Sequence, residues 1–162
     1  MSNKNDFKPY ISADKVLPEL TITSIITCLI LAVVFGAANA YLGLRFGMTI
    51  SASIPAAVIS MGIIRVIMRR NSILENDMVQ TIGSAGESLA AGAIFTLPAL
   101  FMWAAESSSV AAPSFWNIAM LGLFGGILGV LFMIPLRNAL IVEEHGVLPF
   151  PEGTACAEVL LV

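Results

Sequence analysis

Long apolar runs alternate with short polar segments along most of the chain. The runs predict four membrane-spanning helices, at residues 21–41, 48–68, 82–103 and 115–135, and the apolar segment 154–162 predicts the start of a fifth. About 20 helical residues, at ~1.5 Å rise each, cross the ~30 Å hydrocarbon core of a bilayer, so each run is long enough. We therefore expect an all-α, polytopic helical membrane protein.

Glycine and proline refine the borders of these spans. Gly43 and Gly47 predict a tight connection over residues 42–47. Pro55 predicts a kink in the second span, because proline removes a helical hydrogen bond and clashes with the preceding turn. Residues 71–80 are polar and predict a connection before the third span.

The two ends of the chain differ in polarity. Residues 1–20 contain lysines, acids and prolines, and they predict a solvated cytoplasmic tail before the first span. The apolar segment at the C-terminal end has neither a polar flank nor a capping residue. We therefore expect the chain to continue into further spans, with residues 21–162 forming the N-terminal part of a transmembrane domain.

The composition agrees with a membrane protein and disfavours an enzyme. Hydrophobic residues make up 57% of the chain and charged residues 12%, with a mean hydropathy of +0.90, whereas a soluble domain carries about 25% charged residues. The spacing of Cys28, Cys156 and His145 fits no metal site. The sequence also lacks a serine–histidine dyad, a zinc-protease pair and a phosphate-binding loop. We therefore expect no enzyme activity, no cofactor, no metal site and no nucleic-acid partner.

Positive charges are distributed unequally between the two sides of the predicted bundle. Seven of the 8 lysines and arginines fall on the side of the N-terminus: Lys4, Lys8, Lys15, Arg65, Arg69, Arg70 and Arg137. Arg45 falls on the opposite side, where Trp103 and Trp116 border one loop as interfacial aromatic residues do. Because lysine and arginine concentrate in cytoplasmic loops, we expect a multi-pass protein of the plasma membrane with a cytoplasmic N-terminus.

Glu87 is the one acid in the third predicted span. A carboxylate near the middle of a bilayer costs about 2.5–3.5 kcal/mol on insertion scales, so Glu87 must face protein or water. Such acids commonly line a proton, ion or substrate pathway. The alternative is a structural acid held by a hydroxyl or backbone group near a helix start. Asn39, near the end of the first span, also has two interpretations: it lines a cavity, or it ties the helix end.

Small residues predict faces on which helices pack closely. The candidate packing residues are Gly36, Gly83, Gly86, Gly122, Gly125, Gly126 and Gly129. The pairs 122/126 and 125/129 have the GxxxG spacing that lets helix backbones approach. Packing within one bundle is the favoured explanation, and packing against a partner protein is the alternative.

Two acids accompany the predicted fifth segment. Glu152 lies in its first turn, where a carboxylate also suits the helix dipole. Glu158 lies six residues further on, beside apolar residues. Both are candidates for a substrate or proton pathway, and Glu158 is the stronger of the two.

Three long motifs resemble the oligopeptide transporter family. They are NAYLGLRFGMTISASIPAAVISMGIIR at 39–65, ENDMVQTIGSAGESLAAGAIFTLPAL at 75–100 and VEEHGVLPFPEGTACAEVL at 142–160. The similarity is closest to the prokaryotic members, which are related to the yellow stripe-like metal-chelate carriers. The SPYxEVR-type signature of the eukaryotic peptide-transporting branch is absent from the sequence. Three residues match the family's EN-x-x-x-Q pattern and are expected to fix the entry to the third span: Glu75, Asn76 and Gln80.

The resemblance implies a secondary active transporter, driven by protons, for oligopeptides or peptide-like metal chelates. Its partners are then the lipid bilayer, protons and the substrate. The residues and the resemblance together place Glu87 and Glu158 in the substrate or proton pathway, and Glu152 and Asn39 remain further candidates for it. Family members are several times longer, so the remainder of a transporter chain is expected. The alternative function is a noncatalytic membrane subunit that packs against a partner through glycine-rich helices.

Overall fold

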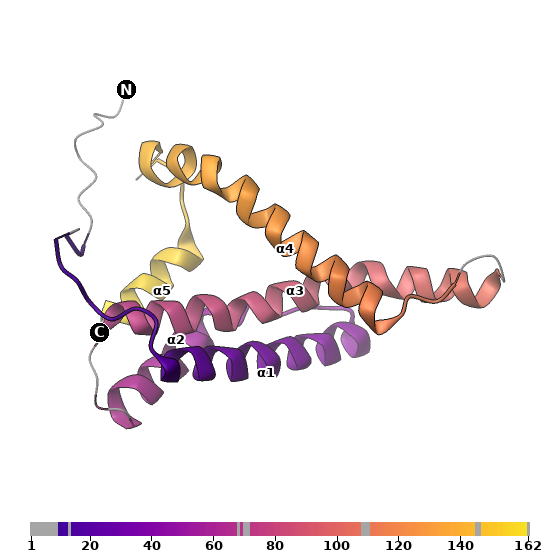
Figure 1. Cartoon of the computed structure of the whole chain (residues 1–162), viewed down its shortest axis with the longest axis horizontal. Coiled ribbons are helices and arrows are strands. Elements are labelled where there is room, and N and C mark those ends of the chain that lie inside the picture. Colours follow the sequence, from indigo (N-terminus) through magenta and orange to yellow (C-terminus); the bar gives the residue numbers. More distant parts are fainter. Residues whose placement is uncertain are drawn as a thin grey trace. The chain divides into compact units, whose positions relative to one another are not determined.

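The computed structural model describes residues 10–12, 14–67, 69, 72–107, 111–144 and 147–161. Its α-helices are α1 (Ile22–Phe46), α2 (Ser53–Met61), α3 (Ile73–Glu106), α4 (Phe115–Arg137) and α5 (Pro151–Leu161), and two π-helical segments, η1 (Gly62–Ile67) and η2 (Asn138–Glu143), accompany them (Figure 1). The described residues contain no strand, so the expectation of an all-α protein is confirmed for them. Part of the expected tail over residues 1–20 lies outside the described residues. His145 also lies outside them.

The chain forms two compact units. The first comprises Val16–Met102 and Pro151–Val162, and it holds α1, α2, η1, α5 and most of α3. The second comprises Met1–Lys15 and Trp103–Phe150, and it holds α4 and η2. We call the first unit the main unit, because it contains all the acids proposed above for a transport pathway.

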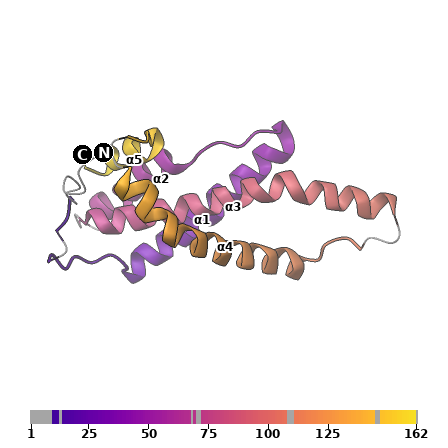
Figure 2. The ribbon, with the colours of Figure 1, turned by 90° about the horizontal axis from the view of Figure 1, so that it is seen from above.

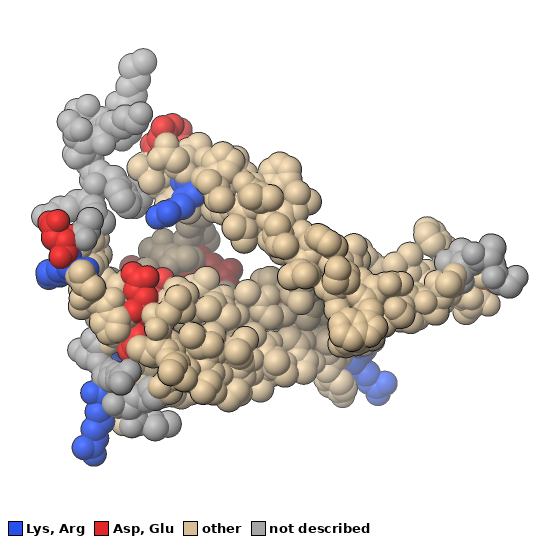
Figure 3. Space-filling view, viewed as in Figure 1, with Lys and Arg blue, Asp and Glu red and all other residues tan. Residues whose placement is uncertain are grey.

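Among the described residues, three helical stretches are long and apolar enough to cross a membrane: Ile22–Phe46, Ile73–Glu106 and Phe115–Glu143. The basic residue of the last turn of α1 is Arg45, and the visible surface over the middle of α1 is uncharged (Figure 3). These stretches match the first, third and fourth expected spans. The expected count of four spans and the start of a fifth is not confirmed by the described residues.

α1 has a capping residue at each end. The Ser24 N–H donates to the Thr21 hydroxyl at 3.2 Å, and the Thr21 N–H donates to the Ser24 hydroxyl at 2.9 Å. Gly47 has a left-handed φ of 70°, which glycine adopts without Cβ strain, and its N–H donates to the Gly43 carbonyl at 2.9 Å. The predicted connection over residues 42–47 is therefore wrong, because the helix continues through Gly43 and ends at Gly47.

The second predicted span has a different form from the one expected. Residues 48–52 are not helical, and they lead into the 9 residues of α2 and the 6 residues of η1. These two helical segments together reach about 22 Å, which is less than the thickness of the hydrocarbon core. Pro55 lies in the first turn of α2, where its missing N–H breaks no helical hydrogen bond. The predicted kink is therefore wrong, since Pro55 is compatible with a helix start.

α3 begins well before the third predicted span. It starts at Ile73 and runs for 34 residues, with Pro98 inside it. The predicted connection over residues 71–80 is therefore wrong from residue 73 onward. Polar residues of that stretch are helical and buried, with Glu75 and Asn76 each 1% exposed and Gln80 9% exposed.

α1 and α3 meet at a close glycine contact in the main unit (Figure 2). A Cβ atom added at Gly36 would lie 3.1 Å from the Gly86 carbonyl oxygen, and one added at Gly86 would collide with the backbone of Ala32. Small residues at such a crossing let the two backbones approach. The apolar core of the unit consists of Cys28, Leu31, Ile64 and Val79.

Candidate functional site

Asn39 binds the non-helical segment 48–52 at Ile50. After Gly47 the chain turns back along α1, which brings Ile50 beside Asn39 (Figure 2). Asn39 Nδ2 donates to the Ile50 carbonyl at 3.1 Å, and the Ile50 N–H donates to Asn39 Oδ1 at 2.9 Å. Asn39 is only 2% exposed. The side chain thus satisfies both backbone polar groups of one residue, as a neighbouring strand would, and this supports the interpretation that Asn39 ties the chain.

Glu87 binds the next part of the same segment. The Ala52 N–H donates to Glu87 Oε2 at 2.8 Å, and Glu87 is 9% exposed. Ala52 is the N-cap residue of α2, and its own side chain makes no capping hydrogen bond. A carboxylate from another helix therefore accepts from an N–H at the helix start, where it also interacts favourably with the helix dipole.

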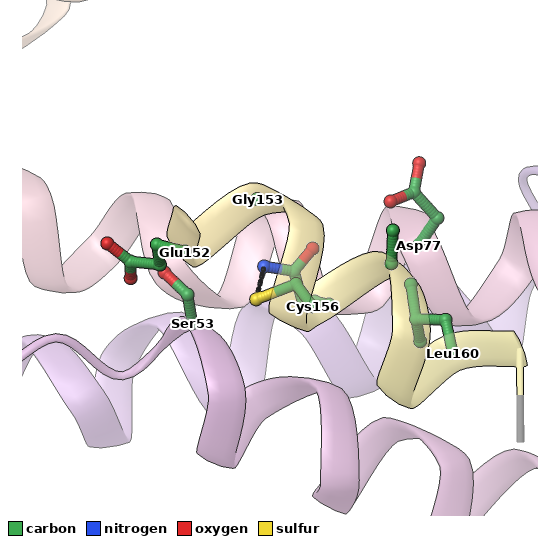
Figure 4. A pocket seen from close by; sticks show the side chains of 8 residues that line it. Ser53, Asp77, Glu152, Gly153, Cys156 and Leu160 are labelled. Atoms are coloured by element: carbon green, nitrogen blue, oxygen red, sulfur yellow. Dashed lines mark hydrogen bonds between the residues drawn. The ribbon is translucent and has the colours of Figure 1, made fainter. Parts of the chain in front are cut away.

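Glu152 reaches the segment from α5. The Ser51 hydroxyl donates to Glu152 Oε1, and the Ser53 hydroxyl also bonds to this carboxylate. Figure 4 shows Glu152 beside Ser53 at the start of α5. Because Ser51 and Ala52 are adjacent, the structure brings Glu152 and Glu87 to consecutive residues of one backbone segment.

A pocket of about 330 Å³ lies between α2, α3 and α5 (Figure 4). Its lining residues are Ser53, Asp77, Gln80, Glu152, Gly153, Cys156, Ala157 and Leu160. Gln80 Nε2 donates to Cys156 Sγ at 3.8 Å across the pocket wall. The lining holds two carboxylates, and none of these eight residues is basic. Such a pocket suits a cationic or hydrogen-bond-donating group, because the carboxylates attract positive charge.

The main unit also contains a pocket of a different kind. It has a volume of about 480 Å³ and is lined by apolar residues of α1 and α3: Ala40, Leu44, Ala90, Ala93, Ile94, Leu97, Pro98 and Phe101. Apolar walls of this kind cannot orient a polar ligand, so the pocket beside Glu152 is the better candidate site. Among the described residues, no group of three or more histidines, cysteines or acids is arranged to hold a metal ion.

Sequence analysis missed several residues of the polar pocket. It did not single out Asp77, it assigned no site role to Cys156, and it expected Gln80 only at the helix entry. The available signal was helical spacing: Asp77 and Gln80 are three residues apart, which places them on one face of a helix. Both lie on α3. This signal becomes visible only when the helix is known to begin at residue 73.

Glu158 does not join the other candidate residues. It is exposed on α5, and it is not one of the residues that line the polar pocket. The preference for Glu158 over Glu152 therefore has no support from the geometry of the described residues.

The candidate packing glycines fall into two groups. Those at the α1–α3 contact are closely packed: Gly36, Gly83 and Gly86. A Cβ atom added at Gly83 would lie 3.3 Å from Leu31 Cβ. On α4, an added Cβ atom would meet no described atom within 4 Å at Gly125, Gly126 and Gly129. Gly122 is half-buried.

Comparisons with known proteins agree with the resemblance noted in the sequence. The family described as OPT oligopeptide transporter protein matches residues 19–162. A protein from Haemophilus influenzae named "Putative oligopeptide transporter" is 47% identical over 120 residues, which cover 74% of this chain and 18% of the relative. The chain thus spans less than a fifth of the length of that relative. No solved structure matches the chain significantly. The long family match, together with the apolar helices, shows that this membrane protein belongs to the OPT oligopeptide transporter family.

Proposed function

We propose that the protein is a proton-coupled secondary active transporter for oligopeptides or peptide-like metal chelates. The observation that carries the proposal is the family match over residues 19–162, which covers nearly the whole chain. The relative from Haemophilus influenzae carries the name of an oligopeptide transporter. A family of transporters also argues against an enzyme, and we propose that the chain acts on its substrate without chemical change.

Glu87 supports the proton coupling. It is a nearly buried acid in the middle of α3, a helix long and apolar enough to cross a membrane. An acid that gains and loses a proton during transport provides the coupling that a proton-driven carrier requires.

The polar pocket supports a role in substrate binding. Two of its lining residues, Glu152 and Asp77, are acids, and the buried amide of Gln80 adds hydrogen-bonding capacity. A peptide carries a protonated amino group, which is the kind of group that such a lining attracts. We therefore assign Glu152 to the substrate pathway, and we assign to Asn39 and Glu87 the role of holding the segment that leads into the pocket residue Ser53.

The positive charges support a location in the plasma membrane with a cytoplasmic N-terminus. Arg65, Arg69 and Arg137 follow the predicted spans on the side of the N-terminus, while Arg45 lies on the other side. The rule that lysine and arginine concentrate in cytoplasmic loops then gives the orientation.

Proton-driven uptake in proteoliposomes tests the proposal. The protein, expressed from its complete reading frame, is reconstituted, and uptake of labelled trialanine and of a labelled iron chelate is followed with the outside acidic. We expect uptake of one of these substrates that falls to the gradient-free level when a protonophore is added. Uptake that ignores the protonophore would contradict proton coupling. Absence of uptake for both substrates would favour the noncatalytic membrane subunit, for which the open glycines of α4 offer a packing face.

A further inference from the structure

The non-helical segment 48–52 lies within the apolar stretch that hydropathy places in the membrane. The four residues before the N-cap Ala52 cover up to about 13 Å, because a fully extended chain rises ~3.3 Å per residue. The two helical segments that follow, α2 and η1, add about 22 Å. Together they exceed the ~30 Å hydrocarbon core, so residues 48–67 are long enough to cross it, with one half non-helical and one half helical.

Such a broken span needs partners for its free backbone groups. A bilayer core offers no water to an exposed N–H or C=O, and non-helical backbone is tolerated there only where protein groups satisfy it. The main unit supplies two such groups. Asn39 from α1 satisfies the N–H and the carbonyl of Ile50, and Glu87 from α3 satisfies the N–H of Ala52.

The held segment leads directly into Ser53, a residue that lines the polar pocket. Ser51 lies between the two anchored residues, Ile50 and Ala52, and its hydroxyl bonds to Glu152. Ser53, which lines the pocket, follows directly and bonds to the same carboxylate. Movement of the segment would therefore move these serines away from Glu152.

We infer that Asn39 and Glu87 are positioning residues of a broken membrane span, residues 48–67, and that they hold its non-helical half so that Ser51 and Ser53 meet Glu152. In this role Glu87 acts through the acceptor geometry of its side chain and not through its charge. The inference goes beyond the proposed transport function, because it holds whatever the substrate is and whether or not Glu87 carries a proton.

The reactivity of the Cys156 thiol reports whether the pocket keeps its structure. It lines the pocket, it is 6% exposed, and Gln80 donates to its sulfur. The rate at which N-ethylmaleimide modifies Cys156 is measured in detergent by peptide-resolved mass spectrometry, on protein expressed from the complete reading frame. Glu87→Ala and Asn39→Ala remove the anchors. Glu87→Gln keeps an acceptor for Ala52, and Ser88→Ala is the control, because Ser88 is exposed on α3 and its hydroxyl donates to the Ser84 carbonyl of its own helix.

We expect each alanine variant at the anchors to raise the modification rate about tenfold, the factor that one buried hydrogen bond contributes to an equilibrium. Glu87→Gln and Ser88→Ala should stay within about twofold of the wild type, since one retains the hydrogen bond and the other does not touch the segment. Wild-type reactivity in both Glu87→Ala and Asn39→Ala would overturn the inference. So would Glu87→Gln behaving like Glu87→Ala, which would make charge the cause. If Glu87→Ala does not fold, Asn39→Ala and Ser51→Ala decide the question, because Ser51 is exposed and its hydroxyl bonds to Glu152 and Ser53 at the pocket.

The crossing itself has a separate test. Single cysteines replace Met48 and Arg69, which are both exposed and lie at opposite ends of the proposed broken span. An impermeant thiol reagent should label the two positions from opposite sides of the membrane. Labelling of both positions from the same side would show a re-entrant loop, and the broken span would be excluded.

Discussion

Asn39 pairs with Ile50 through two hydrogen bonds, of 3.1 Å and 2.9 Å, that join a helix to a non-helical segment. The two residues are eleven positions apart, so the pair closes the turn through which the chain leaves α1 and runs back along it. Without this pair, the buried amide of Asn39 and the backbone of Ile50 would need other partners. The stability of the turn should therefore depend on the side chain at position 39.

Replacing Asn39 with alanine should lower the free energy of unfolding by about 1–3 kcal/mol, because the change removes two hydrogen bonds that contribute about 0.5–1.5 kcal/mol each. Thermal unfolding of the purified protein in detergent measures the effect. Asn117→Ala is the matched control, since Asn117 is exposed in the first turn of α4. Equal unfolding temperatures for the two variants would show that the Asn39–Ile50 pair does not stabilise the fold.

The α1–α3 contact should tolerate no side chain at Gly86. A Cβ atom there would collide with the backbone of Ala32, so Gly86→Ala should destabilise the protein by about 1–3 kcal/mol through overpacking. Gly92→Ala is the control, because Gly92 lies on the same helix with no described atom within 4 Å of an added Cβ atom. Comparison of the two unfolding temperatures decides the matter, and a stable Gly86→Ala variant would contradict the close approach.

The fourth predicted span agrees closely with the structure, while the second does not. α4 starts at Phe115 after the capping residue Ser114, as the apolar run predicts, and it ends two residues beyond the expected border. Residues 48–52 belong to an equally apolar run, yet they are not helical. Hydropathy reports which residues avoid water. It does not report that side chains from other helices, such as Asn39 and Glu87, replace the helical hydrogen bonds.

Several residues of the candidate site could be predicted from the sequence, but the contacts that join them could not. Glu87, Asn39 and Glu152 were found from the sequence because polar residues in apolar surroundings are conspicuous. Their common attachment to one backbone segment depends on contacts between residues as far apart as Ser51 and Glu152, which no local pattern encodes. Asp77 was overlooked for a related reason, since the polar stretch around it reads as a connection until α3 is known to include it.

The open glycines of α4 predict a further packing partner in the protein expressed from its complete reading frame. Gly126 has no atom of its own unit within 4 Å of an added Cβ atom, so Gly126→Leu has no steric conflict within that unit. If another helix packs on this face, Gly126→Leu should reduce expression and detergent stability, because a large side chain prevents close backbone approach. Gly122→Leu is the companion variant. Unchanged expression and stability for both would show that this face contacts lipid.

The proposed orientation predicts which loops an impermeant thiol reagent can reach. Ala112 lies in the connection before α4, and Val147 lies in the connection after η2; both are exposed. A cysteine at position 112 should react in intact cells, and one at position 147 should react only after permeabilisation. The reverse labelling pattern would invert the orientation and move the N-terminus outside.

The central claim is that Glu87 both positions the segment at Ala52 and carries the coupled proton. Glu87→Gln separates these roles, because glutamine retains an acceptor for the Ala52 N–H but cannot titrate. Thiol reactivity of Cys156 should show that the variant keeps the pocket wall in place. Glu158→Gln is the comparison, since Glu158 is the other candidate acid and is exposed on α5.

The most direct measurement is gradient-driven uptake by Glu87→Gln in proteoliposomes, with the reconstituted amount matched to the wild type. We expect Glu87→Gln to abolish uptake driven by a pH gradient, while exchange of substrate without a gradient continues, because exchange does not require the proton to cycle. Full gradient-driven uptake by Glu87→Gln would contradict the account and leave Glu87 as a purely structural acid.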